Sequence, residues 1–151
     1  MGEVLLHTVT GYAGYETVFY CTHRWLHHPS LFAYHAMHHA SKASVGVSGM
    51  YQGSVDYFLT TTLAHSLAPL LCNTHVSVLW ITAFLGGINS VQSHGGYVWT
   101  WDVLPSPADH ALHHVNYKCN FATGPLDRLF GTYCPAANTK RTLPRDGISL
   151  S

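Results

Sequence analysis

Residues 57–92 read YFLTTTLAHSLAPLLCNTHVSVLWITAFLGGINSVQ, which is two apolar runs joined by a short polar link. The runs cover residues 57–72 and 76–92, and neither contains Asp, Glu, Lys or Arg. A link of three residues suits the tight connection between two antiparallel helices. A helix needs roughly 17–25 apolar residues to cross a bilayer, so each run is of marginal length. Because both runs lack charge, we predict a membrane hairpin at 57–92, with two core helices of a soluble bundle as the alternative.

The composition of the whole chain favours the membrane. Its 151 residues are the size of one domain, and residues 136–151 form a polar tail. Only 9% of the residues are charged, against about 25% in an average soluble domain. Seven basic residues balance seven acidic ones, which leaves no basic surface for nucleic acid. We therefore predict an all-α integral membrane helical bundle and no nucleic-acid partner.

The segments that flank the hairpin are predicted from their helix-breaking residues. Residues 15–28 contain no Pro or Gly and are predicted to form a helix, which Pro29 ends. Ser30 is then the expected N-cap of a second helix over residues 31–41. We also expect a loop rich in Gly and Ser, a short helix and a second loop, over residues 42–55, 107–117 and 118–135.

Nine of the thirteen histidines fall in three short boxes. The boxes read HRWLHH at residues 23–28, HAMHH at 35–39 and HALHH at 110–114. Positions i, i+3 and i+4 share one face of a helix, and neutral imidazole is the commonest metal ligand. Eight of these nine histidines, all except His28, are candidate ligands, and His94 between the last two boxes is the ninth. Their spacing predicts a site for two metal ions. The predicted ligands are His23, His27, His35, His38, His39, His94, His110, His113 and His114.

The order of the boxes along the chain brings them to one side of a membrane. Two boxes precede the hairpin and the third follows it, so two crossings return the chain to the side where it started. Arg24, Lys42, Lys118 and Arg128 share that side, whereas residues 73–75 contain no Lys or Arg. The excess of positive charge makes the side of the boxes cytosolic.

Three histidines outside the boxes, His7, His65 and His75, are expected to be structural, with His65 as a polar contact between helices. One isolated box can arise by chance, but three boxes in this order are rarely expected by chance. A membrane protein that only binds or handles metal is the alternative function. A transporter would place histidines inside its apolar spans, whereas these boxes flank them.

The order of the motifs resembles the fatty acid hydroxylase superfamily, which includes methylsterol monooxygenases, sterol desaturases and cholesterol hydroxylase. ETVFYCTHR at residues 16–24 is similar to the family's approach to its first box, and SHGGY at 93–97 to its isolated histidine. LDRLFGT at residues 126–132 resembles the family's closing phrase. LPSP at residues 104–107 looks most like the methylsterol monooxygenase branch.

The resemblance implies a four-helix enzyme of the endoplasmic reticulum membrane with two iron ions. Such enzymes use dioxygen and electrons from NAD(P)H, passed through a b-type cytochrome, to hydroxylate or desaturate C–H bonds of sterols and acyl chains. We therefore expect an oxygen-dependent lipid hydroxylase, with a desaturase or a catalytically inactive protein as alternatives. Asp109 and Asp127 are candidate carboxylates to orient the histidine rings.

The chain departs from the family pattern at three places. Ala36 stands where the family usually has Lys, and Gly53-Ser-Val-Asp56 stands where many members have HPxE. The family's first pair of membrane helices is expected to be absent or reduced to residues 4–20. The expectation is thus a single, possibly truncated, fatty acid hydroxylase-type domain over residues 1–151.

Overall fold

The computed structural model describes residues 2–41, 45–96 and 107–136, which form helices, turns and loops without a strand. This confirms the predicted all-α class. The helices are α1 (Gly2–Leu26), α2 (Phe32–His35), η1 (His38–Ala40), η2 (Gly46–Met50), α3 (Ser54–Asp56), η3 (Tyr57–Leu63), α4 (Ala64–Leu71), α5 (Val76–His94), α6 (Pro107–Asn116) and α7 (Pro125–Leu129). Of these, η1 and η2 are short 3₁₀ turns, and η3 is π-helical.

The first helix is longer at its N-terminus than the sequence predicts. Gly11 and Gly14 lie in the middle of α1 and do not break it. A Cβ on Gly14 would collide with Ala68 of α4, and one on Gly11 would lie 3.1 Å from Val78 of α5. The two glycines therefore let α1 approach its neighbours closely, and this packing compensates for their poor helix propensity.

The predicted helical hairpin is present. Residues 54–71 form one continuous helical segment through α3, η3 and α4, and α5 follows after a short link. Asn73 in the link has a positive φ of 47°, a conformation that Asn tolerates better than most residues. The ring of His75 accepts a hydrogen bond from the backbone N–H of Ser77 and so caps α5. This confirms a structural role for His75.

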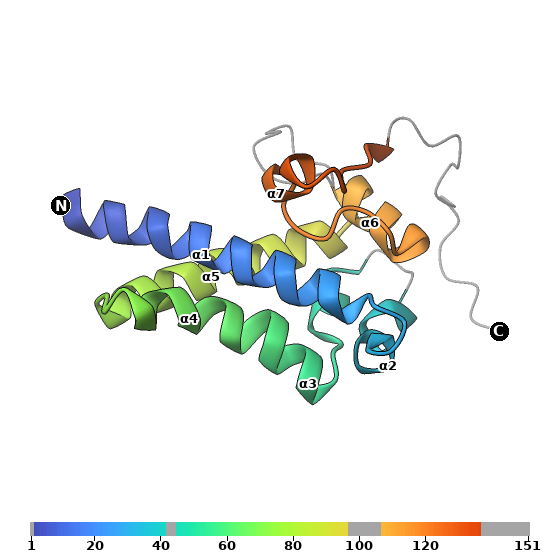
Figure 1. Cartoon of the computed structure of the whole chain (residues 1–151), viewed down its shortest axis with the longest axis horizontal. Coiled ribbons are helices and arrows are strands. Elements are labelled where there is room, and N and C mark those ends of the chain that lie inside the picture. Colours follow the sequence, from blue (N-terminus) through green and yellow to red (C-terminus); the bar gives the residue numbers. More distant parts are fainter. Residues whose placement is uncertain (1, 42–44, 97–106, 137–151) are drawn as a thin grey trace.

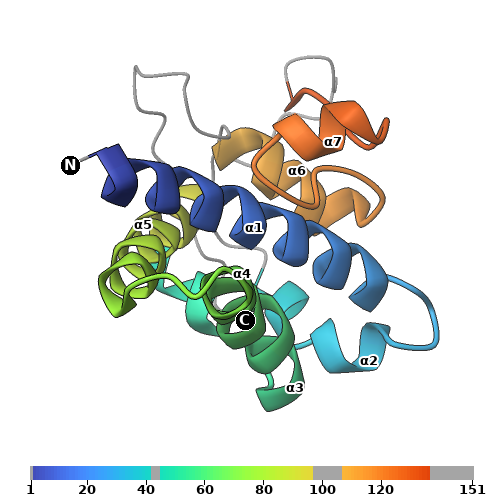
Figure 2. The same cartoon turned by 60° about the vertical axis from the view of Figure 1, so that its left-hand side comes forward.

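Three long helical segments form the body of the molecule (Figure 1). The segment α3–η3–α4 and helix α5 both pack against α1. The shorter helices α6 and α7 lie on the other side of α1, as Figure 2 shows. The C-terminal ends of α1 and α5 meet α2 and α6 at one end of the molecule, and the link between α4 and α5 lies at the other. This arrangement brings the three histidine boxes together.

The outer faces of the long helices are apolar. Leu5 of α1, Leu71 of α4 and Trp80 and Phe84 of α5 each expose more than 65% of their surface. Among the described helices, Val76–His94 is the one that is long and apolar enough to cross a membrane. Among the described residues, in contrast, most of the buried side chains are polar, and seven of the fifteen buried polar residues are histidines.

Four local predictions were wrong or only partly right. Ser30 does not cap a helix, because its hydroxyl bonds the ring of His28 at 2.7 Å, and the N-cap position falls on Leu31. The helix expected over residues 31–41 is split into α2 and η1. The loops expected over residues 42–55 and 118–135 contain η2 and α7. Residues 42–44, the LPS of the LPSP motif and all of the polar tail except Ala136 lie outside the described residues.

Candidate metal centre

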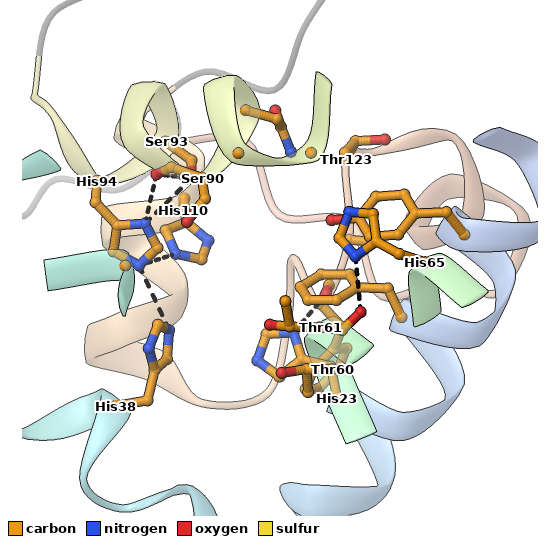
Figure 3. Close-up of a pocket in the computed structure, with 18 of the residues that line it drawn as sticks. His23, His38, Thr60, Thr61, His65, Ser90, Ser93, His94, His110 and Thr123 are labelled. Atoms are coloured by element: carbon orange, nitrogen blue, oxygen red, sulfur yellow. Dashed lines mark hydrogen bonds between the residues drawn. The ribbon is translucent and has the colours of Figure 1, made fainter. Parts of the chain in front are cut away.

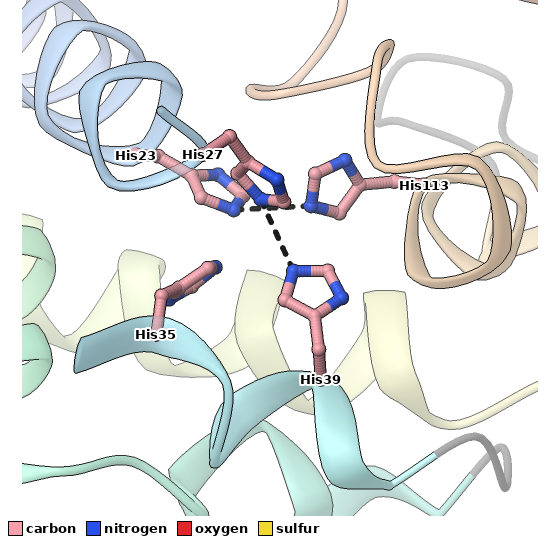
Figure 4. A group of neighbouring side chains, drawn as sticks. All are labelled: His23, His27, His35, His39 and His113. Atoms are coloured by element: carbon pink, nitrogen blue, oxygen red, sulfur yellow. Dashed lines mark hydrogen bonds between the residues drawn. The ribbon is translucent and has the colours of Figure 1, made fainter. Parts of the chain in front are cut away.

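The structure brings all nine predicted ligands together in two adjoining groups. In each group, one ring nitrogen of every histidine lies within 4.8 Å of those of the others. The first group is shown in Figure 4, where histidines from α1, α2–η1 and α6 point at a common centre. It consists of His23, His27, His35, His39 and His113, and the second group consists of His38, His94, His110 and His114.

The second and third boxes each contribute to both groups. His35 and His39, which are four residues apart, belong to the first group, and His38 between them belongs to the second. The third box does the reverse, because His110 and His114 belong to the second group and His113 to the first. The prediction that each box presents one shared face is therefore only partly right.

Backbone carbonyls fix the orientation of several rings. The Nδ1 atom of His23 lies 2.6 Å from the carbonyl oxygen of Phe121, and that of His113 lies 2.7 Å from the carbonyl of Cys119. Nδ1 of His94 lies 2.8 Å from the carbonyl of Ser90. A carbonyl oxygen can only accept, so each Nδ1 carries the proton. In the neutral ring, Nε2 is then left with a lone pair and no proton.

These lone pairs face one another. The Nε2 atoms of His23 and His113 lie 3.1 Å apart (dashed in Figure 4). Since both are acceptors, no hydrogen bond can join them. Two nitrogens that bind one ion at about 2.1 Å, a right angle apart, are separated by about 3.0 Å. In addition, Nε2 of His35 is buried without any hydrogen-bond partner. The nitrogen donors therefore fit a metal ion.

One ring of the first group is held by a carboxylate that the sequence did not suggest. The Oδ2 atom of Asp56 lies 2.7 Å from Nδ1 of His35, and both side chains are almost wholly buried. Thr60 holds the carboxylate in turn, since its hydroxyl donates to the other oxygen, Oδ1, at 3.2 Å. The one signal in the sequence was the departure from HPxE at Gly53–Asp56, which keeps an acid in the last position.

The two predicted carboxylates contact no histidine ring in the part of the chain that the structure describes. Asp127 is fully buried and accepts the backbone N–H groups of Phe121 and Ala122, each at 2.8 Å. It therefore supports His23 indirectly, through the carbonyl of Phe121. Asp109 accepts from the hydroxyl of Tyr133 at 3.1 Å and from the N–H of Ala136.

Burial and mutual repulsion lower the pKa of several box histidines. Loss of solvent, followed by the charge of neighbouring imidazoles, lowers the pKa of His27 to about 3 and that of His114 to about 4. The same two causes hold the pKa of His23 and of His110 well below the ordinary value. At neutral pH these rings are unprotonated, which is the state that a metal ion requires.

A cavity of about 690 Å³ adjoins the centre. His38, His94 and His110 line one side of it, and Thr60, Thr61 and His65 line the other (Figure 3). His65 also packs on the ring of Tyr15, with 4.3 Å between ring centroids, and its Nδ1 lies 2.7 Å from the carbonyl of Thr61. His65 therefore contacts α1 through its ring, in the wall of a cavity, and the polar contact between helices that was expected of it is not among the described hydrogen bonds.

The comparison with protein families decides the class of protein. Residues 8–132 match the family model described as fatty acid hydroxylase. The chain belongs to the fatty acid hydroxylase family. This confirms the resemblance drawn from the motifs. In the structure, the phrase at residues 126–132 forms α7 and the turn after it, where Thr132 donates to the Asp127 carboxylate at 2.7 Å. The phrase therefore serves to fix Phe121 beneath the ring of His23.

Curated relatives cover most of this chain. It is 34% identical over 127 residues to fatty acid hydroxylase domain-containing protein 2 of Macaca fascicularis, covering 83% of this chain and 38% of the relative. It is 29% identical to methylsterol monooxygenase 1 of Rattus norvegicus, over 78% of this chain and 43% of the relative. It is 30% identical to the very-long-chain aldehyde decarbonylase GL1-11 of Oryza sativa subsp. indica, over 89% of this chain and 55% of the relative.

The chain thus spans between 38% and 55% of the length of these relatives. No solved structure matches it. The names of these relatives refer to fatty acids, methylsterols and very-long-chain aldehydes, and they differ in the reaction that they state.

Proposed function

We propose that the chain carries an oxygen-dependent hydroxylase, or monooxygenase, of sterol or fatty acyl C–H bonds, with two iron ions held by the nine histidines. The observation that carries the proposal is the convergence of unprotonated imidazole nitrogens in two groups beside one cavity. Bound iron would supply the activation of dioxygen that the oxidation of an aliphatic C–H bond needs. Membership of the fatty acid hydroxylase family supports the same reaction class.

The protein's own residues would bind and orient the lipid. The cavity volume falls within the range of about 300–1,000 Å³ that small-molecule sites usually have. His23, His35, His38, His94 and His110 all reach its wall, so a lipid in the cavity lies directly against both groups. Phe19 and Leu79 add apolar surface to the wall. They would exclude water from the bound hydrocarbon.

We further propose that the hairpin of α3–η3–α4 and α5 spans the endoplasmic reticulum membrane, with the histidine boxes on the cytosolic side. The apolar residues exposed on α4 and α5 support this, because Leu71, Trp80 and Phe84 would otherwise face water. Electrons from NAD(P)H would reach the centre from a b-type cytochrome on the same side.

The reaction is tested by isotope labelling of lipids. The chain is expressed in cells that lack sterol C-4 methyl oxidation and fatty acyl hydroxylation, under ¹⁸O₂, and the sterols and acyl chains are profiled by mass spectrometry. We expect a product that carries one ¹⁸O atom, and none with the His113→Ala variant. A new double bond without ¹⁸O would instead identify a desaturase with the same centre. Bound metal without any product would identify a metal-binding protein that is not an enzyme.

A further inference from the structure

We propose that the lipid enters the cavity sideways from the bilayer, through an opening between η3–α4 and α5 that Thr62, Ser66, Trp80 and Gly87 border. This inference rests on the proposed function, since it concerns the route of the substrate to the centre. It rests on two observations. Some residues of the cavity wall are also exposed at the surface, and the opening that they mark differs from the other openings of the cavity.

The wall of the cavity extends along one face of α5. Trp80, Ala83, Gly87, Ser90 and His94 all line the cavity, and their spacing of three and four residues puts them on one side of the helix. Fourteen residues separate the first from the last, which corresponds to about 21 Å of helix. His94 belongs to the second histidine group, so this face of α5 leads from the metal centre to Trp80.

The far end of this face is open to the outside. Trp80 lines the cavity and yet exposes 69% of its surface, and Gly87 is likewise exposed. Across from them, Thr62 of η3 is exposed and also lines the cavity, beside Ser66 of α4. Residues that belong both to the wall and to the surface mark an opening. Here they come from two neighbouring helices.

The cavity reaches the surface at two other places. One lies at Met50 and Tyr57, and another at Pro125 and Arg128, where a guanidinium group borders it. The opening between α4 and α5 differs in two respects. It lies between the two runs that contain no charged residue, and exposed Phe84 and Ile88 follow its rim on α5. A lipid dissolved in the bilayer reaches this opening without crossing water.

Gly87 offers a way to close the opening without disturbing the fold. A Cβ added to Gly87 meets no atom within 4 Å, so a larger side chain has space at the rim. Its neighbour Gly86 is different, because a Cβ there would collide with the ring of His65. Ile88 is 46% exposed and does not line the cavity, so Ile88→Phe adds an aromatic ring one residue away from the rim.

The experiment measures uptake of the fluorescent sterol dehydroergosterol, with a pyrene-labelled fatty acid as a second probe. The full chain, loaded with iron, is held in phosphatidylcholine nanodiscs, and energy transfer from its tryptophans to the probe follows uptake over time. We expect Gly87→Phe to slow uptake several-fold, and Ile88→Phe to match the wild type. Metal content should be the same in all three proteins.

Equal uptake rates in Gly87→Phe and Ile88→Phe would overturn the proposal. A Met50→Phe variant that slows uptake when Gly87→Phe does not would overturn it too, in favour of the other opening. If Gly87→Phe slows the uptake of a probe but the wild-type chain oxidises no lipid, the result supports the route and contradicts the proposed function. A wild-type chain that takes up neither probe would remove the route.

Discussion

The Nε2 atoms of His23 and His113 lie 3.1 Å apart although 90 positions separate the two residues in the chain. Each ring is turned to this position by a backbone carbonyl, that of Phe121 for His23 and that of Cys119 for His113. The carbonyls fix the tautomer, so that two lone pairs meet where a proton would be needed for a hydrogen bond. A cation between the rings resolves this contact.

Replacement of a single box histidine should lower the metal content of the purified protein. We expect two ions per wild-type chain, and fewer in His38→Ala and His113→Ala, because each variant removes one nitrogen from a group. His75→Ala is the matched control, since His75 caps α5 outside both groups. Elemental analysis of folded protein in detergent measures the ratio. Equal metal content in all four proteins would contradict the ligand assignment.

Asp56→Asn should weaken metal binding although Asp56 is no ligand. The carboxylate accepts the Nδ1 proton of His35 and so raises the basicity of Nε2, and loss of such a partner costs about 10–100-fold in metal affinity. Competition with a metal chelator measures the affinity. Asp109→Asn is the comparison, because Asp109 contacts no imidazole in the described residues, and a loss of equal size there would count against a specific role for Asp56.

The metal-free protein should become less stable as the pH falls below about 6.5. The pKa of His27 is lowered to about 3 and that of His114 to about 4 in the fold, whereas in the unfolded chain both titrate near 6.5. Between these values the unfolded chain binds more protons, so acid favours unfolding, and the stability lost is greatest once the pH reaches the lowered pKa values. Melting temperatures from pH 7.5 to pH 4 test this. A flat profile would show that the rings are not buried as described, and His113→Ala should give a shallower slope.

The two adjacent glycines of α5 should respond in opposite ways to alanine. Gly86→Ala forces a methyl group against the ring of His65 and should destabilise the protein by about 1–3 kcal/mol. Gly87→Ala meets no atom and should stabilise α5 by up to about 1 kcal/mol, through helix propensity. Denaturation in detergent compares the two. The double variant Gly86→Ala/His65→Ala should recover part of the loss, and its failure to do so would place the clash elsewhere.

The orientation of the hairpin can be tested with reporters. A glycosylation acceptor inserted at Thr74, in the link between α4 and α5, should be modified in microsomes, because the link is expected to lie in the lumen. An acceptor appended to the C-terminus should stay unmodified and accessible to protease from the cytosol. Modification of both sites or of neither would reject a hairpin that crosses the membrane.

Much of the centre could be predicted from the sequence, because spacings of three and four residues encode proximity along a helix. The distribution of the ligands between two groups could not. The second box does not continue as one α-helix, since α2 ends at His35 and a 3₁₀ turn begins at His38. The break turns His38 towards His94 and His110, and no local pattern in HAMHH announces it.

Two further features depend on contacts between distant parts of the chain. Asp56 lies 21 positions from His35 and meets it only because α3 packs beside α2. Gly11 and Gly14 suggest an interrupted helix when they are considered alone. They become favourable once α4 and α5 lie against them, because a Cβ on Gly14 would collide with Ala68 and one on Gly11 would lie 3.1 Å from Val78. Local propensity cannot include either effect.

The second and third boxes each supply ligands to both histidine groups, so the two groups depend on the same two boxes. Without the third box, the first group would keep four imidazoles and the second only two; without the second box, each would keep three. No half of this chain contains one whole group of ligands. A descendant that loses the second or the third box therefore loses ligands from both groups at once.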